Sequence, residues 1–74
     1  MNIFLSNLSG KSLYEQIYEQ IKQQILEGTL SAGAALPTIR GLAKDLKISV
    51  ITTARAYSDL ERDGFIYSVV GKGS

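Results

Sequence analysis

Two short amphipathic segments, separated by only about three residues, constrain this chain more than any other feature. In both segments, small or apolar residues recur at the three- and four-residue spacing of a helix. These residues are Ile39, Leu42, Ala43 and Leu46 in the first segment, and Thr53, Ala56, Tyr57 and Leu60 in the second. Lys47 and Ile48 leave room only for a tight turn. The spacing predicts helices over about 39–46 and about 50–63, packed together as a helix-turn-helix.

A third helical pattern precedes this pair. Ser12 and Glu15 match a capping box, in which the hydroxyl and the carboxylate each accept a backbone N–H at the start of a helix. Apolar residues then recur up to Gly28, a residue that can end a helix in the left-handed conformation. They are Tyr14, Ile17, Tyr18, Ile21, Ile25 and Leu26. The pattern predicts a helix over about 13–27.

The other two helices have start signals of their own. Thr38 and Ser49 are the predicted N-caps of the helices over 39–46 and 50–63. Gly41 lies inside the shorter helix and is expected to weaken it by about 1 kcal/mol relative to alanine.

Strand signals lie on both sides of the helix pair. Residues 31–36 fit a turn and a brief strand, and residues 65–70 are mostly β-branched or aromatic, which is typical of a strand. Gly71, Lys72 and Gly73 then indicate a hairpin turn, but the sequence ends one residue later without a return strand. We therefore predict a mainly α winged helix-turn-helix, with three helices and a small β-hairpin as the wing. We also expect the chain to be a fragment, or trimmed at its C-terminus.

The chain divides into a predicted arm, residues 1–11, and a predicted winged-helix domain, residues 12–74. The first ten residues carry no charged side chain. Their apolar side chains after Met1 are Ile3, Phe4, Leu5 and Leu8. An apolar side chain forgoes about 1.5–3 kcal/mol of stabilisation when it stays in water. We therefore expect the first three of these to pack on the first helix or on a neighbouring molecule.

Composition excludes several classes of protein. The 74 residues include no cysteine and no histidine, which excludes disulfide scaffolds, zinc fingers, thiol nucleophiles and a histidine general base. Glu15 and Glu19 alone are too poor a ligand set for a metal site. No apolar run approaches the roughly 20 residues of a membrane span, and the start lacks the basic segment of a signal peptide. We predict a cytoplasmic protein that is not an enzyme and uses no cofactor or metal.

Charge is segregated along the chain, although the net charge is only +1. Residues 38–58 carry a local charge of +3, whereas residues 11–37 sum to −1 and residues 59–64 to −2. The charged residues of the basic centre are Arg40, Lys44, Lys47 and Arg55, opposed by Asp45. Neutralising phosphates is the physical use of such a centre, and a helix-turn-helix places its second helix in the major groove. The sequence therefore predicts a module that binds double-stranded DNA.

Four stretches of the sequence resemble one protein family. They are LYEQIYEQIKQQILEG at 13–28, LPTIRGLAKDL at 36–46, ISVITTARAYSDLERDGFIY at 48–67 and GKGS at 71–74. Together they cover nearly all of residues 12–74 and are similar to the DNA-binding domain of GntR-type bacterial transcription regulators, most of all to the YtrA branch. The resemblance implies a nucleoid-associated repressor that binds a two-fold symmetric operator as a homodimer. It implies a short helical dimerisation segment beyond Ser74, and it indicates no particular small-molecule effector.

The resemblance also implies which residues contact DNA. Arg40 corresponds to an arginine that reaches DNA from the helix over 39–46, and Thr52 to a hydroxyl that binds phosphate. Gly71 corresponds to a wing-tip glycine whose backbone enters the minor groove, with Lys72 beside it. The recognition helix is expected to span about Val50 to Asp63. The predicted DNA-binding residues are Thr38, Arg40, Ser49, Val50, Ile51, Thr52, Arg55, Gly71, Lys72 and Gly73.

The start of the predicted recognition helix departs from the family pattern. Val50 and Ala54 stand where many members carry basic side chains that bind guanine. Val50 and Ile51 are expected to contact thymine methyl groups instead. Arg55 is then the one cation on this helix able to reach a groove or a phosphate.

Each of these roles has a structural alternative. Arg55 could instead form a salt bridge to Asp59, four residues further on. Val50 fits the core as well as the groove, and partial burial is favoured for Ile51. Tyr14 is expected in the core or at an interface, with a contact from its hydroxyl to phosphate as the alternative. For the whole chain, the alternative is a winged-helix module that binds another protein.

Overall fold

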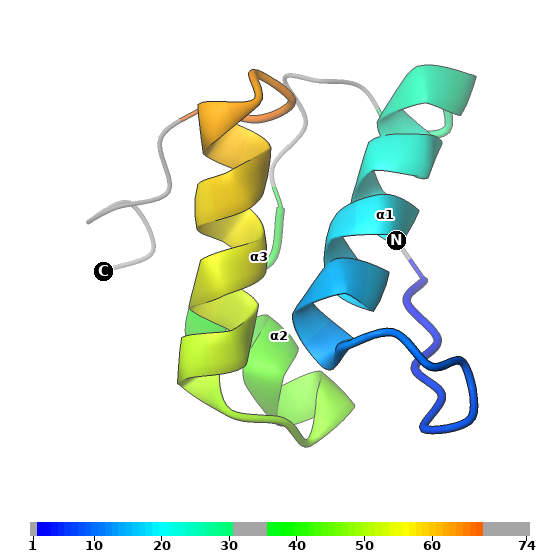
Figure 1. The fold of residues 1–74 in the computed structure, drawn as a ribbon. Coiled ribbons are helices and arrows are strands. Elements are labelled where there is room, and N and C mark those ends of the chain that lie inside the picture. Colours follow the sequence, from blue (N-terminus) through cyan, green and yellow to red (C-terminus); the bar gives the residue numbers. More distant parts are fainter. Residues whose placement is uncertain (1, 31–35, 68–74) are drawn as a thin grey trace.

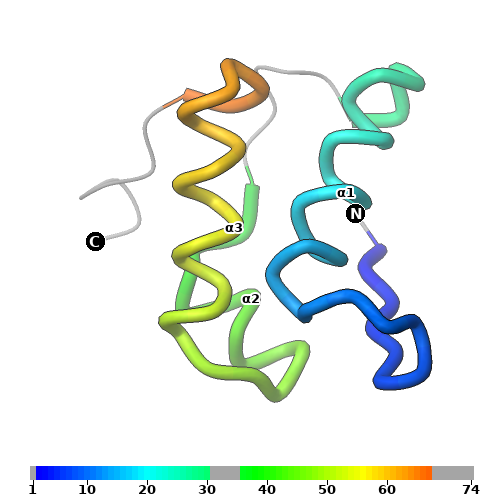
Figure 2. Tube along the Cα trace, in the orientation of Figure 1, coloured from blue at the N-terminus to red at the C-terminus, as the bar shows by residue number. Residues whose placement is uncertain are grey.

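The computed structural model describes residues 2–30 and 36–67, which form three helices in the order expected. They are α1 (Leu13–Glu27), α2 (Ile39–Leu46) and α3 (Val50–Arg62). The helix α3 packs against both of the others, and α1 and α3 begin at the same end of the molecule (Figure 1). The tube in Figure 2 shows the short turn that joins α2 to α3 at that end. The three predicted helices are confirmed, and α3 ends one residue earlier than expected.

The predicted start of α1 at Ser12 and its predicted end at Gly28 are both confirmed. The hydroxyl of Ser12 accepts the N–H of Glu15, and the Glu15 carboxylate accepts the N–H of Ser12 at 3.1 Å. The bond from the Ser12 backbone, the larger cause, and a second bond from the Ser12 hydroxyl to the same carboxylate lower the pKa of Glu15. At the other end, Gly28 has φ +82° and donates its N–H to the carbonyl of Ile25. Local hydrogen bonds therefore determine where α1 begins and ends.

The turn between α2 and α3 depends on a strained residue. Lys47 has φ +59°, the only positive φ of a non-glycine residue in the described parts of the chain. Its N–H donates to the carbonyl of Lys44 at 3.2 Å, and the N–H of Ile48 donates to the carbonyl of Ala43 at 3.0 Å. A left-handed conformation costs a residue with a side chain roughly 1–2 kcal/mol. These two bonds offset part of that cost and close α2 tightly enough for α3 to fold back across it.

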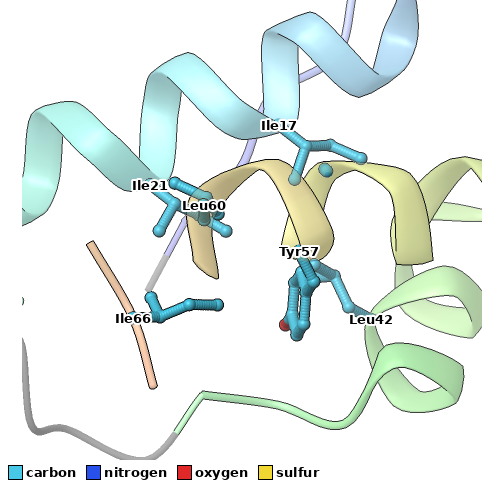
Figure 3. Packing of buried hydrophobic residues seen from close by; sticks show 7 residues of the cluster. Ile17, Ile21, Leu42, Tyr57, Leu60 and Ile66 are labelled. Atoms are coloured by element: carbon cyan, nitrogen blue, oxygen red, sulfur yellow. The ribbon is translucent and has the colours of Figure 1, made fainter. Parts of the chain in front are cut away.

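The core lies where α3 meets the other two helices. Ile21 of α1 lies beside Leu60 of α3, and Ile17 points towards α3 further along the helix, while Tyr57 points from α3 towards α2 (Figure 3). Tyr57 is almost fully buried and its hydroxyl donates to the carbonyl of Pro37 at 2.8 Å. Burial raises the pKa of Tyr57 to about 12, so this phenol stays neutral at physiological pH. The predicted core face of α3 is confirmed, since all four of its residues are buried.

The prediction that Leu26 belongs to the apolar stripe of α1 that faces the core is wrong. Leu26 is 63% exposed, whereas Ile17 and Ile21 are fully buried. An α-helix turns about 100° per residue, so Leu26 lies about 140° around the axis from Ile21. It therefore points away from α3.

Three glutamines of α1 hold the N-terminal arm. The N–H of Phe4 donates to Oε1 of Gln20 at 2.9 Å, and Nε2 of Gln20 donates back to the carbonyl of Phe4 at 2.7 Å. Gln16 makes the same pair of bonds with Ser6, both at 2.9 Å, and Nε2 of Gln24 donates to the carbonyl of Asn2 at 2.9 Å. Each side-chain amide thus bonds the arm as a neighbouring β-strand would.

The arm fits α1 because two repeats nearly match. Alternate residues of an extended chain are about 6.6 Å apart, and every fourth residue of a helix is about 6 Å further along its axis. The arm runs antiparallel to α1, because Gln16 bonds to Ser6, Gln20 to Phe4 and Gln24 to Asn2. Each step of four residues along α1 thus corresponds to a step of two residues along the arm. The pattern of apolar residues alone does not predict this contact. The sequence feature that corresponds to it is the spacing of the glutamines at i, i+4 and i+8.

The expected packing of the arm is confirmed in part. Ile3 and Leu5 pack against the core cluster, but Phe4 is 77% exposed and Leu8 is 95% exposed. Successive side chains of an extended segment point to opposite sides. Because Ile3 and Leu5 face the core, Phe4 between them faces solvent.

Removing one of these glutamines tests the arm. Gln16→Ala is expected to destabilise the protein by about 1–3 kcal/mol, because it leaves the carbonyls of Ser6 and Lys11 without their part-buried donor. Gln23→Ala is the matched control, since Gln23 lies on the exposed face of α1 and bonds to Glu27 of the same helix. Thermal unfolding of both variants, beside a protein lacking residues 1–8, measures the contribution. Equal melting temperatures for the two glutamine variants would contradict the expected contribution of Gln16.

Gly41 leaves room for the cap of α2. A Cβ atom at this position would lie 2.9 Å from Oγ1 of Thr38, the atom that accepts the Gly41 N–H and caps α2. Gly41→Ala should gain about 1 kcal/mol of helix propensity and lose a cap worth about as much. We expect unchanged stability in the parent and a gain of about 1 kcal/mol in a Thr38→Ala background, measured by urea unfolding. The same gain in both backgrounds would show that the cap and a side chain at 41 are compatible.

The structure describes only part of the predicted wing. Residues 65–67 do not form a strand, and the N–H of Phe65 donates to the carbonyl of Leu60 at 2.9 Å, which turns the chain back after α3. Residues 68–70 of the expected strand lie outside the described residues, as do Gly71, Lys72 and Gly73. Of the expected turn and strand at 31–36, the structure describes only Leu36, which is not in a strand. The three-helix part of the fold is therefore confirmed, and the β-hairpin remains a prediction.

Candidate nucleic-acid interface

The start of α3 carries an exposed apolar pair. Val50 is 40% exposed and Ile51 is 82% exposed, so the expected partial burial of Ile51 is wrong. Ile51 precedes the buried Thr53 by two residues, which places it about 200° around the helix from the core face. Both side chains are therefore available to the thymine methyl groups of a major groove.

The hydroxyls of Ser49 and Thr52, both at the start of α3, form different hydrogen bonds. Ser49 accepts the N–H of Thr52 at 2.9 Å and donates its own proton to Oγ1 of Thr52 at 2.8 Å. Both functions of the Ser49 hydroxyl are thus engaged in capping α3. The Thr52 hydroxyl accepts from Ser49, and its own proton remains available to an acceptor such as a phosphate oxygen. Thr52 thus fits the predicted contact with DNA. Ser49 would affect that contact only through its hydrogen bond to Thr52.

Arg55 does not form the salt bridge considered as its alternative role. The Asp59 carboxylate instead accepts from Nη1 of Arg62 at 2.8 Å. The guanidinium of Arg55 lies over the ring of Tyr14 in α1, with Cζ 3.8 Å from the ring centroid. This contact between helices was not predicted. Nothing local in either segment indicates it, because the partners are 41 positions apart in the sequence.

The start of α2 presents a second arginine. Arg40 is exposed on the first turn, two residues after the capping Thr38. Among residues 2–30 and 36–67, Arg40 takes part in no ion pair. Lys44 and Lys47 are likewise exposed. These side chains keep their full charge available to an anionic partner.

The opposite end of α3 is acidic. The Tyr18 hydroxyl donates to the Asp63 carboxylate, which lowers the pKa of Asp63, and Arg62 lowers it further. Lys22 lies over the rings of Tyr18 and Phe65, at 5.7 Å and 5.5 Å from their centroids. Cations at this end are therefore paired or stacked near carboxylates. None of the ion pairs among the described residues involves Arg40 or Arg55, although the charges of Arg55 and Glu15 do interact. The charge segregation expected from the sequence is thus present along the helix.

The described segments contain no cluster of side chains suited to holding a metal ion. None of their helices has the length and apolar character needed to traverse a membrane. Of the predicted DNA-binding residues, Thr38 and Arg40 lie at the start of α2, and Ser49, Val50, Ile51 and Thr52 lie at the start of α3. Arg55 lies in the middle of α3, and the predicted wing residues lie outside the described segments.

Comparison with known proteins assigns the chain to a family. The family described as bacterial regulatory proteins of the gntR family matches residues 13–74. The HTH-type transcriptional repressor YtrA of Bacillus subtilis is 38% identical over 66 residues, which are 89% of this chain and 51% of that protein. An HTH-type transcriptional regulator of Mycobacterium tuberculosis is 42% identical over 53 residues, which are 72% of this chain and 44% of that protein. The chain thus spans about half the length of these relatives, which are transcription regulators and not enzymes.

Solved structures of two similar proteins support the same assignment. YtrA from Sulfolobus acidocaldarius, a GntR-family transcription factor, superposes with a TM-score of 0.83 at 37% identity, over 96% of this chain and 60% of that one. A transcriptional antiterminator from Listeria monocytogenes superposes with a TM-score of 0.89 at 34% identity, over 99% of this chain and 55% of that one. Because one family matches nearly the whole chain and its relatives share both sequence and fold, this chain belongs to the gntR family of bacterial regulatory proteins.

Proposed function

We propose that this chain is the DNA-binding part of a transcription regulator that recognises specific duplex sequences. The observation that carries the proposal is the group of exposed cations on the helix-turn-helix, above all Arg40 and Arg55, which form no ion pair among the described residues. They lie on the two helices of that motif, and the Thr52 hydroxyl on the first turn of α3 has a proton to donate. Phosphate contacts would set the register of α3 in the major groove.

Within this proposal, DNA binding occupies residues 12–74, and residues 1–11 form an arm that steadies α1. The regulator is a cytoplasmic, nucleoid-associated repressor that occludes a promoter as a homodimer. Support comes from the Bacillus subtilis relative, which is a repressor. A two-fold symmetric operator follows from two-fold symmetry of the protein, and linking two half-sites multiplies their affinities.

The predicted base contacts complete the proposal. Val50 and Ile51 would contact thymine methyl groups and favour A·T pairs, because neither can hydrogen-bond to guanine. Arg40 would supply guanine contacts from α2. The wing residues Gly71 and Lys72, with Gly73, would add contacts in the minor groove.

The salt dependence of binding tests the proposal directly. An arginine that neutralises a phosphate contributes about −0.9 to the slope of log K against log salt, so Arg55 alone predicts a slope of about −0.9 per domain. Affinity for a duplex selected from a random pool should fall at least about 3.5-fold between 50 and 200 mM salt. Arg55→Ala should remove about 0.9 from the slope, whereas Arg62→Ala, a cation paired with Asp59 and Asp63, should leave it unchanged.

A flat salt response would favour the alternative function. In that case the exposed side chains Phe4, Leu8 and Ile51 would be the contacts of a module that binds another protein. A symmetric motif in the selected pool would support the regulator and its dimeric state together.

A further inference from the structure

A tyrosine outside the helix-turn-helix lies against the central cation of the candidate interface. Tyr14 is half-buried in the first turn of α1, and Arg55 is exposed in the middle of α3. The guanidinium carbon of Arg55 is 3.8 Å from the centroid of the Tyr14 ring. This distance is short for a cation–π contact, which extends to about 6 Å.

Stacking holds the guanidinium without consuming its donors. All five N–H groups of an arginine lie in the guanidinium plane, so a ring against the face leaves the edges open to a phosphate. A carboxylate partner would occupy those edges and cancel the charge. Asp59 instead pairs with Arg62. The charges of Glu15 and Arg55 interact, but the Glu15 carboxylate bonds to the backbone and side chain of Ser12 and forms no ion pair with Arg55.

We propose that Tyr14 is a positioning residue that holds Arg55 ready to bind a DNA phosphate. This inference rests on the proposed function and extends it to α1, which lies outside the helix-turn-helix. An arginine free in solution must lose rotamer freedom when it binds, and this loss weakens association. The tyrosine ring restricts those rotamers before DNA arrives. The expected gain in affinity is about 2- to 12-fold for one side chain ordered in advance.

Four variants test this role: Tyr14→Phe, Tyr14→Leu, Arg55→Ala, and the last two combined. The dissociation constant for a duplex selected from a random pool is measured at one fixed salt concentration, and the salt slope is measured separately. Tyr14→Phe keeps the ring and should bind like the parent. Tyr14→Leu should bind about 2- to 12-fold more weakly with an unchanged salt slope, because Arg55 and its charge remain. Within the Arg55→Ala background, Tyr14→Leu should have no further effect.

A measurement without DNA reports the contact itself. Because the guanidinium carbon of Arg55 is 3.8 Å from the ring centroid, the side-chain protons next to the guanidinium should resonate upfield in the parent and in Tyr14→Phe. Their shift should return to an ordinary value in Tyr14→Leu. Circular dichroism and melting temperature establish that each variant is folded.

Several results would overturn the inference. Equal weakening by Tyr14→Leu with and without Arg55 would make Tyr14 a purely structural residue. Weakening by Tyr14→Phe as large as that by Tyr14→Leu would mean that the hydroxyl itself binds DNA. Either result, together with a loss of affinity in Arg55→Ala, leaves the proposed function intact. A parent protein with no salt-dependent affinity for DNA would instead overturn both.

Discussion

Leu60→Ala is expected to lower the free energy of unfolding by about 2–5 kcal/mol, because the truncation leaves a cavity that the neighbouring helices cannot close. Leu60 is fully buried and lies beside Ile21 at the junction of α1 and α3 (Figure 3). A domain of this size is stable by only about 4–11 kcal/mol. The loss should therefore lower the melting temperature by more than about 8 °C.

Leu26→Ala provides the matched control for this prediction. It removes the same atoms from the same residue type in a helix, but Leu26 is 63% exposed. Its cost should stay within about 0.5 kcal/mol. Urea unfolding of the two variants, followed by circular dichroism, measures both. Similar losses would mean that the α1–α3 junction is not the centre of the core.

Val50→Arg is expected to move the base preference of the protein towards guanine at one position per half-site, by about 1–3 kcal/mol. Val50 is exposed at the first position of α3, where an arginine could present two donors to the edge of a guanine. The added charge should also raise non-specific affinity. Competition binding against duplexes that differ at single positions, at one salt concentration, measures the preference.

Two further variants separate charge from base recognition. Gln23→Arg adds the same charge on the exposed face of α1, and should leave the base preference unchanged. Arg40→Ala should cost the parent about 1–3 kcal/mol of discrimination, and less in the Val50→Arg variant, which would have a second guanine contact. An unchanged preference in Val50→Arg would show that this side chain does not face the groove.

Local features of the sequence predicted most of the helical structure correctly. Ser12, Thr38 and Ser49 each cap a helix as expected, because an N-cap needs only backbone N–H groups a few residues away. The buried face of α3 was predictable for a similar reason, since helical spacing alone determines which residues share a side. The exposure of Leu26 and Ile51 is set by where the neighbouring helices lie, and no pattern within one helix contains that information.

The sequence predicted which residues form the candidate interface, but not the contacts that they make. Arg40, which is exposed, and Thr52, which is half-buried, were proposed from family resemblance and charge. The stacking of Arg55 on Tyr14 and the bond from Tyr18 to Asp63 both join α1 to the second half of the chain. Each depends on the relative placement of two helices, to within an ångström or so for a hydrogen bond.

The sequence by itself determined the three helices, their ends, the buried face of α3 and the segregation of charge, because all of these depend on neighbours within about one helical turn. Only the tertiary structure decided that glutamine side chains hold the arm, that Gly41 must leave room for Thr38, and that Arg55 rests on an aromatic ring. These features arise between atoms that meet only after the helices have packed. Their energies depend on distances and angles that hydrophobic packing sets and that local spacing does not encode.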